Sequence, residues 1–78
     1  MLLFGAIGDV AGWRERGIDP APTSLFVLRD RLTDEDPALG EALRGKGVQA
    51  AVDKTLVRGD AALTPSAEVA FLPPMSGG

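Results

Sequence analysis

The spacing of hydrophobic positions changes several times along the chain, and each spacing predicts a different element. Residues 2–6, Leu-Leu-Phe-Gly-Ala, form a short apolar run typical of a buried strand. The segment 7–13 is expected to add one helical turn that Gly12 closes. Residues 14–22 contain few strand-forming side chains and two prolines, so a strand there is expected to be short, irregular or at a sheet edge.

A helix that contributes to the core is predicted after Thr23, which is a plausible N-cap. Three leucines follow at i, i+3 and i+7, the spacing of one helical face: Leu25, Leu28 and Leu32. Phe26 and Val27 are expected to widen this apolar stripe or to touch a second element. The charged residues 29–31 are expected on the opposite, solvated side.

A second, shorter helix is marked by residues typical of helix ends. Asp36 is a suitable N-cap, Pro37 suits the first helical position, and Gly45 is placed for the C′ position. Leu39 and Leu43 are four residues apart and are expected to form the buried edge of this helix.

The second half of the chain changes to a period of two, which is typical of strands. Residues 48–52 alternate and predict a half-buried strand, residues 53–54 a turn, and residues 56–57 a short returning strand. Residues 58–67 have the composition of a loop. The last strand is expected at residues 68–72.

In that last strand Val69 and Phe71 are predicted to face inward, with Glu68, Ala70 and Leu72 on the other face. Strands on both sides of one main helix predict an α+β fold in which a small sheet packs on that helix. An outward Leu72 beside two prolines and Met75 would begin an apolar surface patch, which on a small protein often binds a partner.

Composition excludes several classes of chemistry. The 78 residues contain no Cys and no His, so they offer no cysteine nucleophile, no thiolate metal site and no histidine base. A net charge of −3 argues against a nucleic-acid partner. The apolar start is too short for a membrane span and has no positively charged segment before it, so the chain is interpreted as a cytoplasmic domain. Gly5, Gly8 and Gly12 do not have phosphate-loop spacing and are interpreted as turn glycines.

The final eleven residues, Glu-Val-Ala-Phe-Leu-Pro-Pro-Met-Ser-Gly-Gly, carry no charged side chain after Glu68. This run resembles the end of the MoaD family, the small sulfur-carrying subunits of molybdopterin synthase, which are ubiquitin-like. The segment Ala50–Val57 also fits, whereas Asp53 and Ser66–Ala67 depart from the family pattern. The resemblance implies a β-grasp domain over residues 1–72 and a flexible Gly-Gly tail over residues 73–78.

The resemblance also implies a function. An ATP-dependent activating enzyme would adenylate the Gly78 carboxylate, a sulfur donor would convert it to a thiocarboxylate, and the large synthase subunit would use its sulfur to make molybdopterin from a cyclic pyranopterin. No cofactor is expected on the chain, and ATP is consumed by the activating enzyme. Two small subunits flanking a large-subunit dimer are implied. The tail residues implied to bind partners are Phe71, Leu72, Pro73, Pro74, Met75, Ser76 and Gly77.

The residue types suit that role. Gly78 leaves the reacting carbon uncrowded, Gly77 permits close approach in a narrow channel, and Pro73 and Pro74 favour an extended course. Three alternatives remain: a sulfur carrier for thiazole synthesis, a protein modifier joined through its terminal glycine, and an interaction module that uses only the Leu72–Met75 patch. An independent enzyme is disfavoured because the chain has no His and no Cys, and catalytic residues are expected on the partner.

Overall fold

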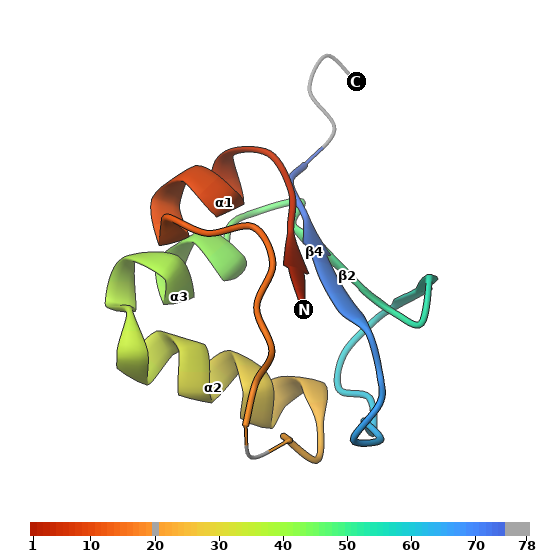
Figure 1. The fold of residues 1–78 in the computed structure, drawn as a ribbon. Helices are drawn as coiled ribbons and strands as arrows, with labels where there is room; N and C mark the ends of the chain where they lie inside the picture. Colours follow the sequence, from red (N-terminus) through yellow and green to blue (C-terminus); the bar gives the residue numbers. More distant parts are fainter. Residues whose placement is uncertain (20, 75–78) are drawn as a thin grey trace.

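The computed structural model describes residues 1–19 and 21–74, and Figure 1 shows their arrangement. Two elements open the chain, β1 (Leu2–Leu3) and α1 (Ala6–Ala11). The helices α2 (Leu25–Glu35) and α3 (Pro37–Leu43) follow. Three strands complete the described part, β2 (Gln49–Val52), β3 (Thr55–Val57) and β4 (Val69–Leu72).

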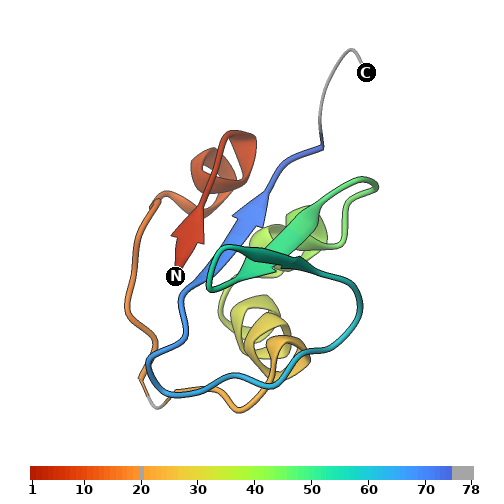
Figure 2. The same ribbon diagram turned by 90° about the vertical axis from the view of Figure 1, so that its right-hand side faces the viewer.

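The four strands form one mixed sheet in the order β1-β4-β2-β3. β1 runs parallel to β4, whereas β2 is antiparallel to both β4 and β3. The helices lie on one side of the sheet, and Figure 2 shows the sheet with α2 and α3 behind it. The α+β fold with a small mixed sheet is therefore confirmed. β4, the last strand in the sequence, lies inside the sheet between β1 and β2.

The core fills the space between the helices and the sheet. Its members are apolar side chains from all three helices and three of the strands: Leu3, Ile7, Leu25, Leu28, Leu32, Leu39, Leu43, Ala50, Val69 and Phe71. The three leucines predicted on one face of α2 are each 1% exposed. Val69 and Phe71 face inward as predicted, because alternate residues of a strand point to opposite faces.

The N-cap of α2 lies one residue after Thr23, which was the predicted cap. The N-cap is Ser24, whose hydroxyl oxygen accepts a hydrogen bond from the Val27 backbone N–H at 3.2 Å. A second acceptor comes from a distant loop, since Asp60 Oδ1 accepts from the Phe26 N–H at 2.9 Å. Phe26 and Val27 do not widen the buried stripe. They are 42% and 43% exposed, because the leucine face alone meets the sheet.

The hydrogen bond from Phe26 to Asp60 is the main reason that the pKa of this carboxyl lies below its ordinary value, and a bond from the Ala61 N–H adds to it. A lowered folded-state pKa means that ionised Asp60 stabilises the fold above the unfolded pKa and that this contribution is lost on acidification. We therefore expect Asp60→Ala to lower the melting temperature at neutral pH. The difference from wild type should narrow below about pH 4 in thermal melts, and a constant difference down to acidic pH would contradict this role.

The N-terminal segment differs from its predicted form. The strand ends at Leu3 because Gly5, at φ +59°, turns the chain, and α1 then begins at Ala6. Gly12 closes α1 in the left-handed conformation, as predicted. No strand forms in the described part of residues 14–22. Glu15 makes an isolated bridge to Leu2, which places this stretch along the β1 edge of the sheet.

The N-cap of α3 and the β2–β3 turn form as predicted, whereas Gly8, which was predicted to lie at a turn, is inside α1. The Asp36 carboxylate accepts from the Leu39 N–H at 3.3 Å, and Pro37 occupies the first turn of α3. Asp53 and Lys54 form the turn between β2 and β3 with φ of +50° and +69°, a conformation that suits two-residue hairpins. Gly45 follows the C-cap of α3, but the positive φ of this connection, +84°, is at Gly47.

Candidate functional site

The candidate site begins where β4 leaves the sheet. Phe71 is 1% exposed and anchors this strand in the core. Its carbonyl oxygen accepts from the Phe4 N–H at 3.1 Å, and on the other side Leu72 lies opposite Gln49 of β2. The segment that follows therefore starts from a central strand with neighbours on both sides.

Two glycines make room for the two prolines that follow β4. A Cβ placed on Gly5 would lie 2.9 Å from Cγ of Pro73, and one on Gly47 would lie 2.7 Å from Cβ of Pro74. Real Cβ atoms do not approach other atoms this closely, so any larger residue would displace the prolines. Both glycines also have positive φ, +59° and +84°, which other residues rarely adopt. Gly5 and Gly47 thus form a seat for the proline pair.

Figure 2 shows the sheet from the side turned away from α2 and α3. A shallow hollow of ≈550 Å³ on this face crosses all four strands. Its lining is mostly apolar: Leu2, Phe4, Gln49, Ala51, Lys54, Leu56, Glu68, Ala70 and Leu72. Phe4 is 44% exposed and Leu56 is 59% exposed, and with Leu2, Ala70 and Leu72 they line one apolar surface, a feature that often marks a binding site. We call this surface the open face.

The charged groups of the site stand at the edge of the open face. Lys54 and Glu68 are the only charged residues among those that line its hollow. The Glu68 backbone N–H donates to Asp53 Oδ1 at 2.9 Å, which joins the start of β4 to the β2–β3 turn. In the described residues, no group of three or more Asp or Glu side chains is arranged to hold a metal ion. Also within those residues, no helix is long and apolar enough to cross a membrane.

The residues predicted for the site take up three positions. Phe71 is in the core, Leu72 lines the open face, and Pro73 and Pro74 lie in the glycine seat. Met75, Ser76, Gly77 and Gly78 lie outside the described residues.

Sequence analysis missed several residues of this region. The roles of Gly5 and Gly47 have no local signal, because their prolines are distant in the sequence. Leu2, Phe4 and Leu56 could be assigned to the open face only once the strand order placed them beside Leu72. The two-residue period of the strands was the only signal available for them.

Together the fold and the site define an α+β domain of ubiquitin-like, β-grasp type whose central strand leads into a proline-glycine segment. The whole chain, residues 1–78, matches the model of the ThiS family, and the protein belongs to this family of small sulfur carriers, which includes the MoaD proteins. It is 31% identical over 78 residues to the molybdopterin synthase sulfur carrier subunit of Escherichia coli (strain K12), covering 100% of this chain and 96% of that protein.

A solved structure supports the same assignment. The crystal structure of SAMP1 from Haloferax volcanii is similar with a TM-score of 0.73 and 25% sequence identity. The similarity covers 99% of this chain and 94% of that one. The family and the fold inferred from the resemblance are therefore confirmed.

Proposed function

We propose that this protein is the sulfur carrier of a molybdopterin synthase, acting in the cytoplasm and carrying its sulfur on the carboxyl group of Gly78. The proposal rests mainly on the run of residues 68–78. This run ends a ThiS-family chain, and the whole chain is similar to a molybdopterin synthase sulfur carrier subunit. The large synthase subunit and an ATP-dependent activating enzyme are the proposed partners, with two carriers flanking a large-subunit dimer.

The chemistry proposed for Gly78 proceeds in balanced steps. A carboxylate oxygen attacks the α-phosphorus of ATP and pyrophosphate leaves, which gives an acyl-adenylate. A sulfur nucleophile from the donor then attacks the acyl carbon and AMP leaves. When that nucleophile is the outer sulfur of a persulfide, the product is an acyl disulfide, and a thiol of the donor or the activating enzyme attacks the donor's sulfur, forms a disulfide with it and releases the thiocarboxylate. The thiocarboxylate sulfur then attacks the pyranopterin precursor on the large subunit, and hydrolysis of the acyl–sulfur bond returns the Gly78 carboxylate. Gly78 has no side chain to hinder attack on its carbonyl carbon.

The arrangement of the described residues supports this role. A tail of residues 73–78 spans roughly 20 Å when extended, at ~3.3 Å per residue, which is enough to enter a partner's active site. Pro73 and Pro74 lie against Gly5 and Gly47 in the glycine seat. This packing fixes the position from which the tail extends. The chain contains no His or Cys, so we assign acid–base and nucleophilic catalysis to the partners and the role of co-substrate to this protein.

The test is the intact mass of the protein after incubation with ATP, the activating enzyme and a sulfur donor. We expect an increase equal to replacement of one oxygen by sulfur, located at Gly78 and absent without ATP. Adding the large subunit and the pyranopterin should return the carrier to its original mass and yield molybdopterin. Loading without this transfer would indicate another acceptor, such as a thiazole precursor or a protein. No loading by an enzyme active on another carrier would refute the proposal.

The open face provides a separate prediction about the partners. Leu56→Ser should leave the free energy of unfolding within about 0.5 kcal/mol of wild type, because Leu56 is 59% exposed. It should weaken binding to the activating enzyme or the large subunit by about tenfold, as expected when ~1.5 kcal/mol of apolar burial is lost.

Isothermal titration calorimetry measures this effect. Val27→Ser is the matched control, because Val27 is 43% exposed on α2, away from the open face. Equal affinities for the two variants would show that the partners do not cover the open face.

A further inference from the structure

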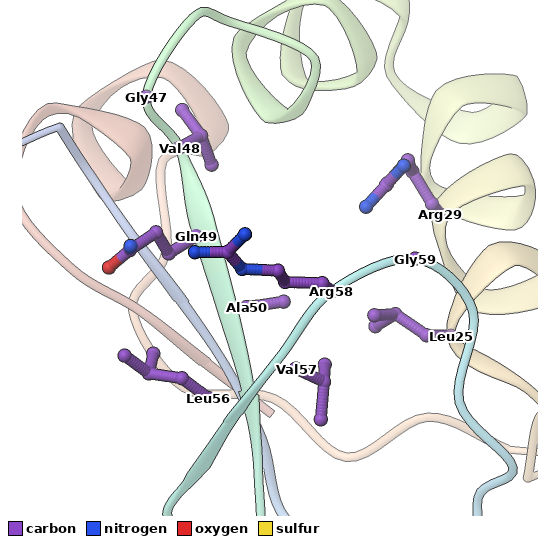
Figure 3. A pocket seen from close by; sticks show the side chains of 10 residues that line it. All are labelled: Leu25, Arg29, Gly47, Val48, Gln49, Ala50, Leu56, Val57, Arg58 and Gly59. Carbon is purple, nitrogen blue, oxygen red and sulfur yellow. The ribbon is translucent and has the colours of Figure 1, made fainter.

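A second hollow, of ≈620 Å³, lies between α2 and the β2–β3 hairpin. Figure 3 shows the side chains that line it, with Arg29 reaching from α2 and Arg58 from the segment after β3. Between these two arginines the lining is apolar: Leu25, Val48, Ala50, Leu56 and Val57. We call this hollow the arginine pocket. It contains positive charge and no carboxylate among its lining residues, although the chain carries a net charge of −3.

The arginines of the pocket differ from the others in their partners. Arg14, Arg16 and Arg44 form ion pairs with Asp9, Glu35 and Asp30. Arg31 donates to the carbonyl oxygen of Asp19. Within the described part of the chain, neither Arg29 nor Arg58 is in an ion pair with a carboxylate. Arg29 and Arg58, which lack such a pair among the described residues, both line this pocket.

The Arg29 side chain packs against an aromatic ring, and one of its donor groups has no hydrogen-bond partner among the described residues. Its guanidinium lies over the Phe26 ring, 5.1 Å from the ring centroid. Its Nε is buried and has no hydrogen-bond partner among the described residues. The nearby Asp60 carboxylate accepts hydrogen bonds at Oδ1 from two backbone N–H groups, which lower its pKa, and it feels the charge of Arg29, which helps to lower this pKa further. The guanidinium group as a whole has no carboxylate ion pair among the described residues, so an anionic ligand that accepts charge-assisted hydrogen bonds from it would be favoured.

The position of the pocket indicates what kind of ligand would reach it. Gln49 and Leu56 line both the arginine pocket and the open face. Gly47 lines the pocket and also seats Pro74, where the tail begins. The pocket therefore adjoins the surface that a macromolecule would cover if it bound the open face or took up the tail. Negative charge at that point of its surface would favour association and register, because the two potentials would be complementary.

We propose that the arginine pocket binds an acidic segment of a partner protein, with Asp or Glu carboxylates accepting hydrogen bonds from Arg29 and Arg58. The planar guanidinium groups suit carboxylates, to which each can donate two parallel hydrogen bonds. The apolar floor accommodates the carbon atoms of the acidic side chains. This proposal does not depend on the sulfur chemistry of the tail, since neither arginine belongs to the tail.

The test uses the full chain labelled with nitrogen-15 and titrated at low ionic strength with a capped tetraglutamate peptide. We expect saturable shifts of the Gly47 and Gly59 amide signals and of the Nε–H signals of Arg29 and Arg58. Added salt should reverse them. A capped tetraglutamine peptide should cause no such shifts, and inorganic phosphate should bind more weakly than tetraglutamate.

Three variants that each remove one positive charge make the test specific. Arg58→Gln should weaken peptide binding about threefold to fivefold, as for an exposed ion pair. Arg29→Gln should weaken it about tenfold, because its Nε is buried. Arg44→Gln should leave it unchanged, since Arg44 lies outside the pocket and faces Asp30.

Three results would overturn the proposal: equal losses for Arg44→Gln and Arg58→Gln, unchanged binding by Arg58→Gln, or tighter binding of phosphate than of the peptide. The last result would instead assign the pocket to a small anion. If Arg29→Gln does not fold, the binding measured for Arg58→Gln is sufficient to test the proposal. Arg58 is exposed and lies outside the core, so its substitution should not disturb the fold.

Discussion

Deletion of Gly78 is expected to reduce sulfur loading by the activating enzyme about 100-fold or more. The deletion moves the carboxylate ~3.3 Å back along the chain, and a displacement of ~1 Å in an active site can already cost about 100-fold in rate. Stability should not change, because the described core contains no residue beyond Phe71. Loading is measured by intact mass, and stability by thermal or urea unfolding.

Gly78→Ala serves as the matched control for the deletion. It keeps the carboxylate at its full reach and adds one methyl group beside the reacting carbon, so its loss of loading should be smaller than that of the deletion. Both variants should retain affinity for the partners, because the open face is unchanged. If the shortened chain is loaded with sulfur as fast as wild type, Gly78 is not the carrier residue. The interaction module that uses only Leu72–Met75 would be the better interpretation if neither wild type nor the shortened chain is loaded while both bind the partners equally well.

Gly47→Ala is expected to have the second-largest effect, acting on the direction of the tail. The new Cβ would lie 2.7 Å from Cβ of Pro74, so the proline must move. The left-handed conformation at φ +84° adds a cost of about 1–2 kcal/mol for a residue with a side chain. Because displacement of the tail misplaces its far end, we expect sulfur loading or transfer to fall by up to about 100-fold.

Gly12→Ala separates the strain of the backbone from the collision with Pro74. Gly12 has nearly the same φ, +83°, and nothing lies within 4 Å of a Cβ placed there. Both variants should therefore lose about 1–2 kcal/mol of unfolding free energy, measured by urea denaturation. Only Gly47→Ala should lose sulfur loading or transfer. Similar activity in the two variants would show that the glycine seat does not direct the tail.

The sequence by itself determined the elements whose formation depends on neighbouring residues. The stripe of Leu25, Leu28 and Leu32 predicted α2, because a helix repeats the same face every three to four residues. Asp36 and the Asp53–Lys54 pair marked a cap and a turn through local backbone preferences. Local preferences were less decisive where the chain is irregular. The sequence of residues 14–22 excluded only a long strand, and in the described part of that range Glu15 makes an isolated bridge to Leu2 at the sheet edge.

The tail run of residues 68–78 was also readable from the sequence, and with it the family to which the chain belongs. Only the tertiary structure decided which distant segments meet. It paired β1 with β4 from opposite ends of the chain, which assembled the open face from Leu2, Leu56 and Leu72.

The same packing placed Gly5 and Gly47 under the two prolines and brought Arg29 and Arg58 to one pocket. A local pattern specifies that one face of an element is to be buried, but not which element covers it. That choice depends on how all the buried faces fit into one core, and so the surroundings of the tail follow from the fold as a whole.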